Sequence, residues 1–505
     1  MQAQEIRPDE TFDLIVVGAG LGGSILSSRI AQFGVNPRNG EKLKIALFEQ
    51  GPYLLKGDPV RGYGTPDRRA KLDNINGEVA RIGELVGGAM THAGLISYPP
   101  MPIDFVQYRE ATGVDWTWEK FNLAIAEMWE MWHPYPEPDA IRTPGQQRFR
   151  EAALKMGLDV HEAGIAKLNC PRCGCCNGHI CKYDAKSSPL VTYIPIAERE
   201  GVRIIPEALV QKVAIEKQGS RPVATGVIYK YHGELRRALA GKTILCCSME
   251  GTPRLLYQSG YGPREKVQGE LVAENRNVGA NRSGSLAAPH IEAYFGEPIK
   301  HSDISVHCVY YTVKSLGPGG YNQLMIRENL GCREGSYTFP TDLALARLAP
   351  EFGREHKQFM KDSLTHWGFL SPEVCKNQVR PKLGEEVLLT RASLEKNQPR
   401  IMEGLREGQE MAYKILKDMG AKKIVGHESL PERFNLGFAT STCRAGASAE
   451  NSVVNSDFEC HDIDNLYVCD RSVPPCQATA NVSMPIAAIT NYAWRRMVAK
   501  HFSRV

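Results

Sequence analysis

The sequence predicts an α/β protein with more than one substructure, organised around a strand, turn and helix near its start. The apolar run Leu14–Val17 is typical of a buried parallel strand, and the glycines after it open a helix with apolar residues at helical spacing. A second strand, residues 44–48, ends on Glu49. Because 505 residues exceed one domain of about 100–200 residues, two or three substructures are expected.

The glycine-rich turn has the spacing of a dinucleotide site. Gly18 allows a tight turn, Gly20 lets the backbone approach a pyrophosphate, and Gly23 lets helix and strand pack closely. Glu49 stands at about the distance where an acid receives the adenosine ribose hydroxyls, and no Arg follows it to hold a 2′-phosphate. A glycine-rich turn of another α/β protein is the alternative. Strand, helix and acid together predict a Rossmann-like dinucleotide domain and disfavour NADP.

The composition is that of an ordinary soluble enzyme. Hydrophobic residues make up 42% and charged residues 23%, and the net charge of +4 is too small and dispersed to favour nucleic acid. The first residues lack a charged region followed by an apolar core, and no apolar run approaches the roughly 20 residues that span a bilayer. We therefore expect a cytoplasmic chain without a transmembrane segment, with export through a partner subunit left open.

The cysteines divide into two groups. Nine of the 14 are scattered, often in apolar settings, and are expected to be buried, reduced thiols. The other five lie within twelve residues, from Cys170 to Cys181. Thiolates are soft ligands, so such a cluster suits an iron–sulfur centre or zinc, although the spacing fits no standard zinc pattern. A disulfide or bare structural thiols are the alternatives.

Three ordered motifs resemble those of the glucose–methanol–choline (GMC) flavin oxidoreductases. They are the opening glycine fingerprint, Gly87-Gly88 followed by His92, and the segment Asp464–Pro475. The resemblance covers both ends of the chain and a middle segment, and it implies FAD as the cofactor. It further implies a discontinuous Rossmann-like FAD-binding domain of residues 1–105, 190–295 and 431–505, a connecting segment 106–189 that contains the cysteines, and an α+β substrate-binding domain 296–430.

The resemblance also implies the residues around the flavin. Gly87 and Gly88 would bring backbone amides against it, and a backbone group near Val210 or Val213 would lie by the adenine. His92 stands where pyranose-oxidase-like members join a histidine covalently to the flavin. Sugar-dehydrogenase-like members have an unlinked histidine there, so a covalent link, an uncoupled flavin-side role and a structural role all stay open.

The reacting groups are implied by the C-terminal segment. Asn481 fills the family's second catalytic position, as a hydrogen-bond partner of the substrate oxygen, and Asp470 would be a polar anchor beside the flavin. The family's first position, a histidine, falls on Phe438, whose ring cannot accept a proton. Alcohol oxidation needs a proton acceptor, so a carboxylate or histidine of the substrate domain must serve. The histidines available there or just before it are His290, His301, His307 and His366.

The cysteine-rich segment resembles that of the bacterial sugar and gluconate dehydrogenase branch. Some members of that branch bind a three-iron cluster that passes electrons out of the flavin. Cys173, Cys176 and Cys181 would be the ligands here, although the spacing departs from the cluster-bearing pattern.

These features predict an FAD-dependent dehydrogenase or oxidase. It would oxidise an alcohol group of a sugar, polyol or aminocyclitol to a carbonyl by hydride transfer to the flavin, and pass electrons to O2, a quinone or a partner protein. The alternatives are a non-redox flavoenzyme, such as an isomerase or eliminase, and an electron-transfer flavoprotein subunit.

Five further elements are predicted from local patterns. A helix is expected over residues 115–132, where the aromatic residues would pack in a core or interface, with carbohydrate stacking as the alternative. Helices are also expected over 343–364 and over 403–419. A strand is expected over 301–313. Thr252 and Pro253 are expected to cap and begin one more helix.

Overall fold

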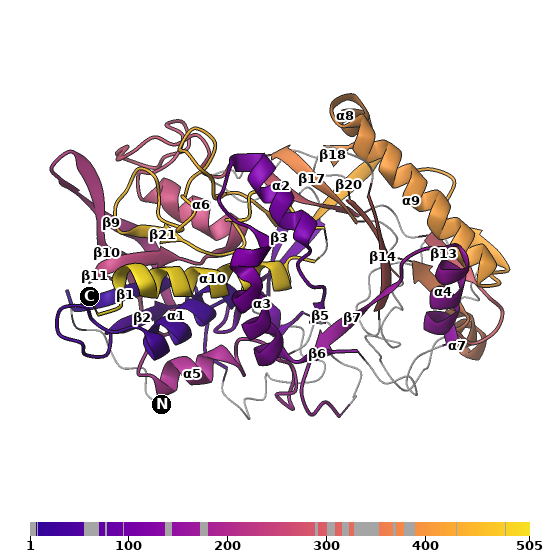
Figure 1. Ribbon diagram of the computed structural model, residues 1–505, viewed down its shortest axis with the longest axis horizontal. Helices are drawn as coiled ribbons and strands as arrows, with labels where there is room; N and C mark the ends of the chain where they lie inside the picture. Colours follow the sequence, from indigo (N-terminus) through magenta and orange to yellow (C-terminus); the bar gives the residue numbers. More distant parts are fainter. Residues whose placement is uncertain are drawn as a thin grey trace.

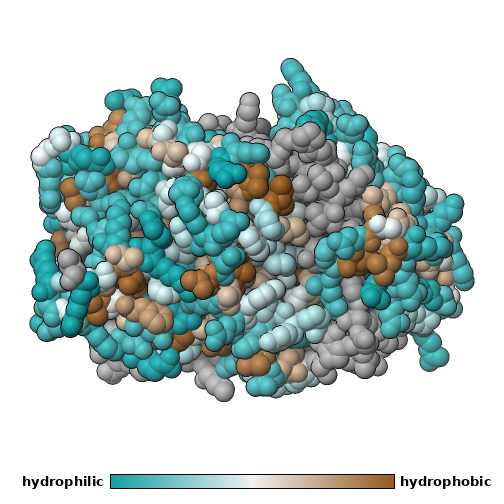
Figure 2. All heavy atoms as spheres, viewed as in Figure 1, coloured by the Kyte–Doolittle hydropathy of each residue, from teal (hydrophilic) through white to brown (hydrophobic). Residues whose placement is uncertain are grey.

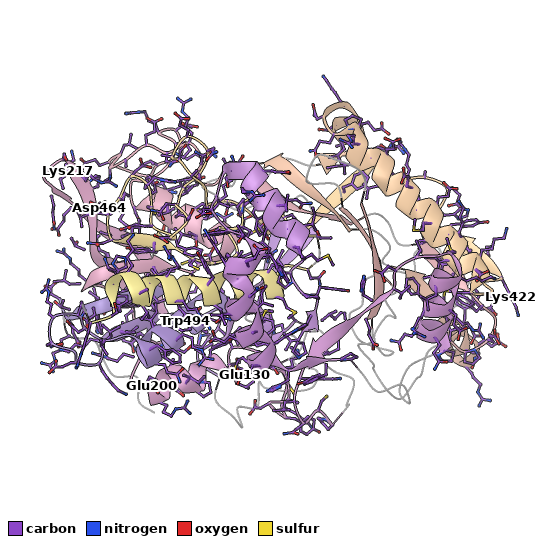
Figure 3. All side chains as sticks on the ribbon, in the orientation of Figure 1. Glu130, Glu200, Lys217, Lys422, Asp464 and Trp494 are labelled. Atoms are coloured by element: carbon purple, nitrogen blue, oxygen red, sulfur yellow. The ribbon has the colours of Figure 1, made fainter. Side chains whose placement is uncertain are left out.

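The computed structural model consists of two bodies that lie side by side (Figure 1). One contains a sheet with helices against it, and the other a second sheet with α9 (Pro399–Asp418) along its outer side. In Figure 3, Lys217 and Asp464 mark the outer edge of the first body, and Lys422 marks the opposite end of the molecule. The structure describes residues 7, 9–54, 70–75, 78–93, 95–136, 144–171, 180–287, 291–299, 309–315, 323–327, 353–366, 370–377, 389–430, 432–479 and 481–504.

The first sheet is the predicted parallel sheet with an antiparallel extension. Its strand order is β8-β2-β1-β11-β10-β9, with β21 paired to β11. Strands β8, β2, β1, β11 and β21 run parallel, and β9, β10 and β11 form an antiparallel meander. The bounds are β1 Thr11–Val17, β2 Ile45–Phe48, β8 Arg203–Ile205, β9 Ala208–Gln218, β10 Arg221–Tyr231, β11 Glu234–Leu245 and β21 Leu466–Val468.

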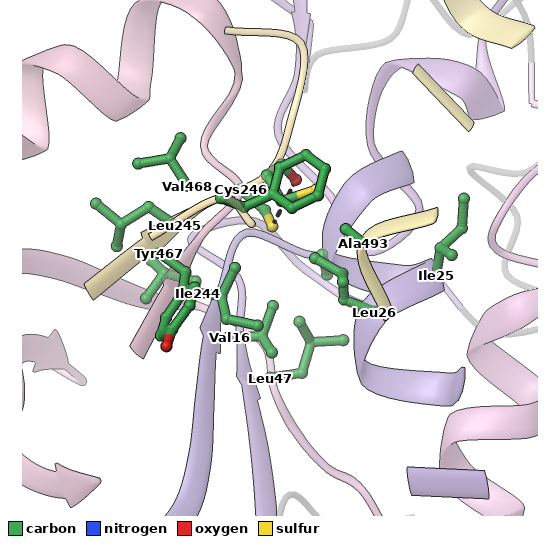
Figure 4. Close-up of a cluster of buried hydrophobic side chains, with 14 of the residues drawn as sticks. Val16, Ile25, Leu26, Leu47, Ile244, Leu245, Cys246, Tyr467, Val468 and Ala493 are labelled. Atoms are coloured by element: carbon green, nitrogen blue, oxygen red, sulfur yellow. Dashed lines mark hydrogen bonds between the residues drawn. The ribbon is translucent and has the colours of Figure 1, made fainter. Parts of the chain in front are cut away.

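Helices bury the central strands of this sheet. The C-terminal helix α10 (Ser483–His501) packs against both α1 (Leu21–Phe33) and α3 (Trp118–Trp132). In Figure 4, side chains of β1, β2 and β11 meet those of α1 and α10 in one core. Burying each large aliphatic side chain of that core contributes about 1.5–3 kcal/mol. The two ends of the sequence therefore share one core.

The second sheet has nine strands in the order β18-β20-β12-β17-β15-β14-β7-β5, with β6 on β7. The helices α4 (Pro144–Lys155) and α8 (Arg391–Asn397) pack with α9 beside it. The strand bounds are β5 Ile96–Ser97, β6 Pro134–Tyr135, β7 His161–Ala166, β12 Arg282–Ala287, β14 Val309–Ser315, β15 Gln323–Arg327, β17 Leu370–Asn377, β18 Leu389–Thr390 and β20 Arg433–Thr440.

The remaining elements are short. Strands β13 (Ile291–Tyr294), β16 (Ser363–His366) and β19 (Lys423–Val425) form a small sheet near α7 (Gly353–Lys361), and β3 (Ala70–Ile75) pairs with β4 (Glu78–Gly83). The helices α2 (Pro102–Thr112), α5 (Tyr193–Arg199) and α6 (Ser248–Gln258) belong to the first body, as does the 3-10 turn η1 (Gly88–Thr91).

The predicted fold class is confirmed, and the domain bounds stay a prediction. Strands of the second sheet come from all parts of the chain, because β7 lies within 106–189, β12 within 190–295 and β20 within 431–505. The second body is therefore assembled from more segments than residues 296–430 alone.

Two of the predicted helices are confirmed and one is wrong at its end. Helix α3 covers 118–132 of the predicted 115–132, because Thr117 caps its start by accepting the N–H of Lys120. Its Phe121, Met128 and Trp132 are buried in the core. Helix α9 contains nearly all of 403–419. Of 343–364, α7 takes only 353–361, and Ser363 and Leu364 belong to β16, where they pair with β13. Residues 343–352 and 301–308 lie outside the described residues, whereas 309–313 form the predicted strand in β14.

Helix α6 begins earlier than predicted. It starts at Ser248, so Pro253 lies inside it rather than in its first turn. Thr252 still serves the helix start, because its hydroxyl accepts the N–H of Cys247 at 3.1 Å. Proline has no N–H for the carbonyl of Met249, and Thr442 Oγ1 donates to that carbonyl instead at 2.6 Å. This tertiary hydrogen bond makes the internal proline tolerable.

Candidate active site

The glycine turn after β1 is as tight as the sequence predicts. Gly18 has φ +98°, and a Cβ on Gly23 would lie 1.9 Å from the carbonyl oxygen of Gly18. Gly22 is equally confined, since its Cβ would lie 2.5 Å from the carbonyl oxygen of Cys469. Helix α1 begins directly after Gly20. The N-terminal N–H groups of α1 thus border a tight turn whose fold requires glycine at positions 18, 22 and 23.

Glu49 connects the end of β2 to this turn. Its Oε2 accepts the N–H of Ala19 and its Oε1 the N–H of Gly51, each at 2.9 Å. Burial raises the pKa of the carboxyl group to about 7, against the effect of these hydrogen bonds. The acid and the glycine turn are therefore one structural unit, as a dinucleotide site requires.

The second glycine pair packs directly on the first turn. Gly87 and Gly88 have φ +96° and +60°, and the N–H of Gly87 donates to the carbonyl of Ala19 at 2.8 Å. A Cβ on Gly88 would lie 2.7 Å from the Cα of Gly20. Segments that are about 70 residues apart in the sequence thus form one surface of backbone.

His92 follows this surface at the end of η1. Its side chain is 8% exposed. The buried Lys186 donates from Nζ to the carbonyl of Thr91, the preceding residue, at 3.2 Å. A buried ammonium group is expensive unless hydrogen-bonded, so this bond fixes the backbone that carries His92.

Asp470 lies where β21 ends, at the same edge of the sheet. Its Oδ2 accepts the N–H of Ser248 at 2.8 Å and the hydroxyl of Thr252 at 2.6 Å, and its Oδ1 accepts the N–H of Ser472 at 2.6 Å. Burial raises the pKa of this carboxyl group. Asp470 therefore fixes the start of α6 beside the glycine turn, and its contact with the flavin stays a prediction.

Val213 lies on β9, five residues beyond the point where this strand meets Glu49. The N–H of Ala208, at the start of β9, donates to the carbonyl of Glu49 at 2.9 Å. The N–H of Val213 donates to Ser259 Oγ at 2.9 Å, and the residue lines an open hollow of about 300 Å³. Val210, the alternative from the sequence, is closer along the strand to Glu49. The adenine contact itself stays a prediction.

Asn481 is half-buried on the loop between β21 and α10. Two residues before it, Thr479 binds Asp104 of α2. Phe438 belongs to β20, and its side chain lies outside the described part of the chain. Two residues after it, Thr440 donates to Gln477 Oε1 at 3.3 Å. The two family positions thus lie on segments that are tied together.

The predicted proton acceptors and metal ligands are only partly described. His290, His301 and His307 lie outside the described residues, as does the side chain of His366 in β16. The same holds for Cys173 and Cys176. Cys181 is a free, half-buried thiol, and no group of three metal-binding side chains occurs within the described ranges. The ligand set stays a prediction.

The scattered cysteines fit their expectation where they are described. Those that are buried are Cys246, Cys443, Cys460, Cys469 and Cys476, and Cys247 is half-buried.

Two residues of this region have no counterpart in the sequence prediction, Asp104 and Lys186. Pro102 two residues before Asp104 was the available signal, because proline at the first position and an acid at the third are typical of a helix start. Nothing local to Lys186 indicates that it is buried.

The glycine turn, the coupled acid and the second glycine pair define a two-domain dinucleotide-binding protein. Models of two GMC oxidoreductase domains match residues 12–283 and 395–490. The chain belongs to the GMC oxidoreductase family, whose members are FAD-dependent oxidoreductases that act on CH–OH groups. The turn fits that cofactor: Gly18 and Gly23 let it fold tightly against its own backbone, and Gly20, whose added Cβ would meet only the Cα of Gly88 at 4.0 Å, leaves the backbone uncovered for a phosphate to approach.

Similarity to individual relatives is low but extends over long stretches. Long-chain-alcohol oxidase FAO3 of Arabidopsis thaliana is 21% identical over 97% of this chain and 68% of its own length. Protein HOTHEAD of the same plant is 35% identical over 54% of this chain and 45% of its own. Cholesterol oxidase of Mycobacterium tuberculosis is 23% identical over 50% of this chain and 48% of its own length. The chain therefore spans about half the length of this relative.

Solved structures of the same fold cover nearly the whole chain. Formate oxidase matches with a TM-score of 0.73 and pyridoxine 4-oxidase from Mesorbium loti with 0.71, both at 16% identity. They cover 98% and 97% of this chain and 99% of their own. At this identity they support the fold alone. Among the described residues, no helix combines the length and apolar character that crossing a bilayer requires.

Proposed function

We propose that the protein oxidises an alcohol group of a small molecule, of the sugar, polyol or aminocyclitol kind, to a carbonyl. The observation that supports this most is the meeting of the glycine turn, the pair Gly87-Gly88 and Glu49 on one backbone surface. This surface lies next to the edge of the sheet from which the Asn481 loop departs. The polar substrate class comes from the resemblance of the sequence motifs to sugar-oxidising members of the family.

Each part of this surface has a role toward FAD. The glycine turn and the N-terminus of α1 would hold the pyrophosphate, and Glu49 would accept the adenosine ribose hydroxyls. Gly87 and Gly88 would bring their amides against the flavin, with Asp470 as a nearby polar anchor. A backbone group of Val210 or Val213 would lie by the adenine. FAD, when bound, supplies a hydride acceptor at N5.

Asn481 would orient the substrate by donating a hydrogen bond from its amide to the hydroxyl oxygen. The hydroxyl proton must leave as the hydride departs, and the phenyl ring of Phe438 cannot take it. We propose that a histidine or carboxylate of the second body accepts this proton. The candidates are His290, His301, His307 and His366.

The electrons would pass to O2, a quinone or a partner protein. Cys173, Cys176 and Cys181 are proposed as ligands of an iron–sulfur cluster for this transfer. Iron and acid-labile sulfide, assayed on anaerobically purified protein, test this directly. The presence of both indicates an external acceptor, and the absence of both leaves the cysteines structural.

The first test of the function is spectroscopic. The purified protein should show flavin absorbance, and an anaerobic panel of sugars, polyols and aminocyclitols should contain a compound that bleaches it. Flavin that stays with the acid precipitate, and leaves it in a His92→Ala variant, would establish the covalent link. Flavin turnover of a substrate without bleaching would favour an isomerase or eliminase instead.

A pair of variants tests the role of Asn481. Asn481→Ala should lower the rate of flavin reduction about 100-fold or more, as for other lost transition-state hydrogen bonds, with FAD content unchanged. The matched control is Asn277→Ala, whose amide donates to the carbonyl of Ala449 at an exposed position. Equal rates in both variants would remove Asn481 from the mechanism. Absence of bound FAD in the native protein would refute the proposed function.

A further inference from the structure

Asp104 is a buried carboxylate that joins α2 to the loop of Asn481. The residue is only 1% exposed. Its Oδ1 accepts both the N–H and the hydroxyl of Thr479, each at 2.8 Å, and its Oδ2 accepts the N–H of Met101 at 2.8 Å. One oxygen therefore caps α2, and the other holds a residue 375 positions away in the sequence.

Such burial is expensive, so the arrangement needs a reason. An ionised carboxylate in an apolar interior is tolerated only when its oxygens are hydrogen-bonded. Hydrogen bonds from N–H groups to a carboxylate are shorter and about twice as strong as neutral ones. Capping of α2 would require only an exposed acid. The contact with Thr479 is what places the carboxylate inside the molecule.

The same face of α2 reaches the other end of this loop. Tyr108, one turn after Asp104, is 1% exposed, and its pKa is raised by burial first and then by its neighbours Asp104 and Cys476. The next residue, Gln477, accepts a hydrogen bond from the hydroxyl of Thr440 in β20. Residues 476–479 are therefore held between α2 and β20, and Asn481 follows two residues later.

We propose that Asp104 is the positioning residue for Asn481. By holding Thr479 through two hydrogen bonds, it fixes the loop so that the Asn481 amide stands at one place relative to the flavin surface. Misplacement of a reacting group by about 1 Å can lower a rate about 100-fold. The proposal rests on the proposed function, because it assumes that Asn481 orients the substrate.

Three variants and a matched control test the proposal in the FAD-loaded protein. Asp104→Asn keeps the shape, but its amide nitrogen must face a donor. Thr479→Val removes only the hydroxyl bond, and Thr479→Ser is the conservative change that keeps both bonds. The control is Asp462→Asn, because Asp462 Oδ2 also accepts two donors, the hydroxyl of Tyr261 at 2.8 Å and the amide of Asn275 at 3.0 Å.

Hydrogen exchange and kinetics give independent readings. We expect Asp104→Asn to speed amide exchange in the peptide 476–482 at least tenfold and to lower kcat about 10- to 100-fold, with FAD content unchanged. Thr479→Val should show smaller changes of both kinds, and Thr479→Ser should restore the native exchange rate. Asp462→Asn should leave exchange in this peptide at the native rate.

The outcomes separate this proposal from the proposed function. If the native protein binds FAD and oxidises alcohols while Asp104→Asn and Thr479→Val keep the native kcat and exchange, Asp104 does not position the loop. If Asp104→Asn fails to fold, Thr479→Val decides by the same two measurements. If exchange rises but kcat stays native in every variant, Asp104 holds the loop but Asn481 does not need it, and the proposal fails. Loss of the proposed function would show in the native protein itself.

Discussion

Replacing Glu49 by Gln tests how one buried carboxylate links stability to pH. The side chain is 7% exposed, and its two oxygens accept the N–H groups of Ala19 and Gly51. Burial raises its pKa from 4.5 to about 7. Glutamine keeps the shape and removes the charge, but its amide nitrogen must face one of the two donors.

The pKa difference sets the size and sign of the effect. Below pH 4.5 the carboxyl group is protonated in both states. Between pH 4.5 and about 7 the unfolded chain loses the proton first, so the free energy of unfolding falls as the pH rises. At about 1.4 kcal/mol per pH unit, this fall amounts to roughly 3 kcal/mol. The glutamine variant lacks this fall.

The hydrogen bond that is lost in Glu49→Gln lowers the stability of the variant at every pH. An unsatisfied buried donor costs about 1–3 kcal/mol. In the FAD-free protein, Glu49→Gln should therefore be less stable than the native chain near pH 5 and equal or more stable near pH 8. Urea titrations of both proteins across this range measure the difference, in which the other titrating groups cancel.

A difference that stays constant with pH would refute the reasoning, because it would mean that the folded carboxyl group titrates as in water. FAD affinity gives a second reading. Loss of hydrogen bonds from ribose hydroxyls to a charged acceptor, at about 1.5–3 kcal/mol each, should raise the Kd for FAD at least about tenfold in Glu49→Gln.

Three further variants test single contacts. Gly88→Ala should abolish FAD binding and lower the Tm, because its Cβ would lie 2.7 Å from the Cα of Gly20. The control Gly157→Ala, with φ +75° and nothing within 4 Å of its Cβ, should show only the backbone strain, and equal Tm losses would contradict this. Thr442→Val should cost about 1 kcal/mol in urea titration by leaving the Met249 carbonyl without its 2.6 Å partner, and an unchanged midpoint would contradict it. Burial and nearby lysines lower the pKa of His501 to about 4. The free energy of unfolding of the native chain should therefore fall as the pH drops from 6.5 toward 4, and it should fall less in His501→Gln. Parallel curves of stability against pH would contradict this.

The parts of the fold that the sequence predicts are those with local causes. The apolar run of β1, the turn at Gly18 and the helix after it depend on neighbouring residues, and all three are confirmed. The amphipathic helices α3 and α9 are confirmed for the same reason. Local pattern was enough wherever one face of an element meets the core.

The corrections come from contacts that local pattern does not contain. Pro253 predicts a helix start by its missing N–H, but the carbonyl it leaves free is bound by Thr442, almost 190 residues later. Ser363 and Leu364 continue a helical pattern, yet they pair with β13, whose position depends on the whole second body. In both cases tertiary hydrogen bonding overrides local preference.

The candidate site shows the same division between features with local causes and features that depend on distant contacts. Motif spacing predicts that the glycine turn, the pair Gly87-Gly88 and Glu49 belong to one site, and their contacts agree. Spacing says nothing about Asp104, because an acid at the third position of a helix is normally an exposed cap. Its burial follows only from where the loop after β21 crosses α2.

Phe438 stands at the position where the resemblance to the family implies a histidine. A second unusual feature, the positive φ of Ser441, follows three residues later. Ser441 has φ +73°, a conformation that costs a non-glycine residue about 1–2 kcal/mol. Its hydroxyl shares hydrogen bonds with Ser283 at 2.7 Å and Thr440 at 2.9 Å, and Thr440 in turn binds Gln477. These buried hydroxyls offset the strain and tie β20 to the loop of Asn481. The strand that carries Phe438 is therefore anchored to the loop of Asn481, which we propose to be catalytic, and this favours a relocated proton acceptor over a site that has lost its activity.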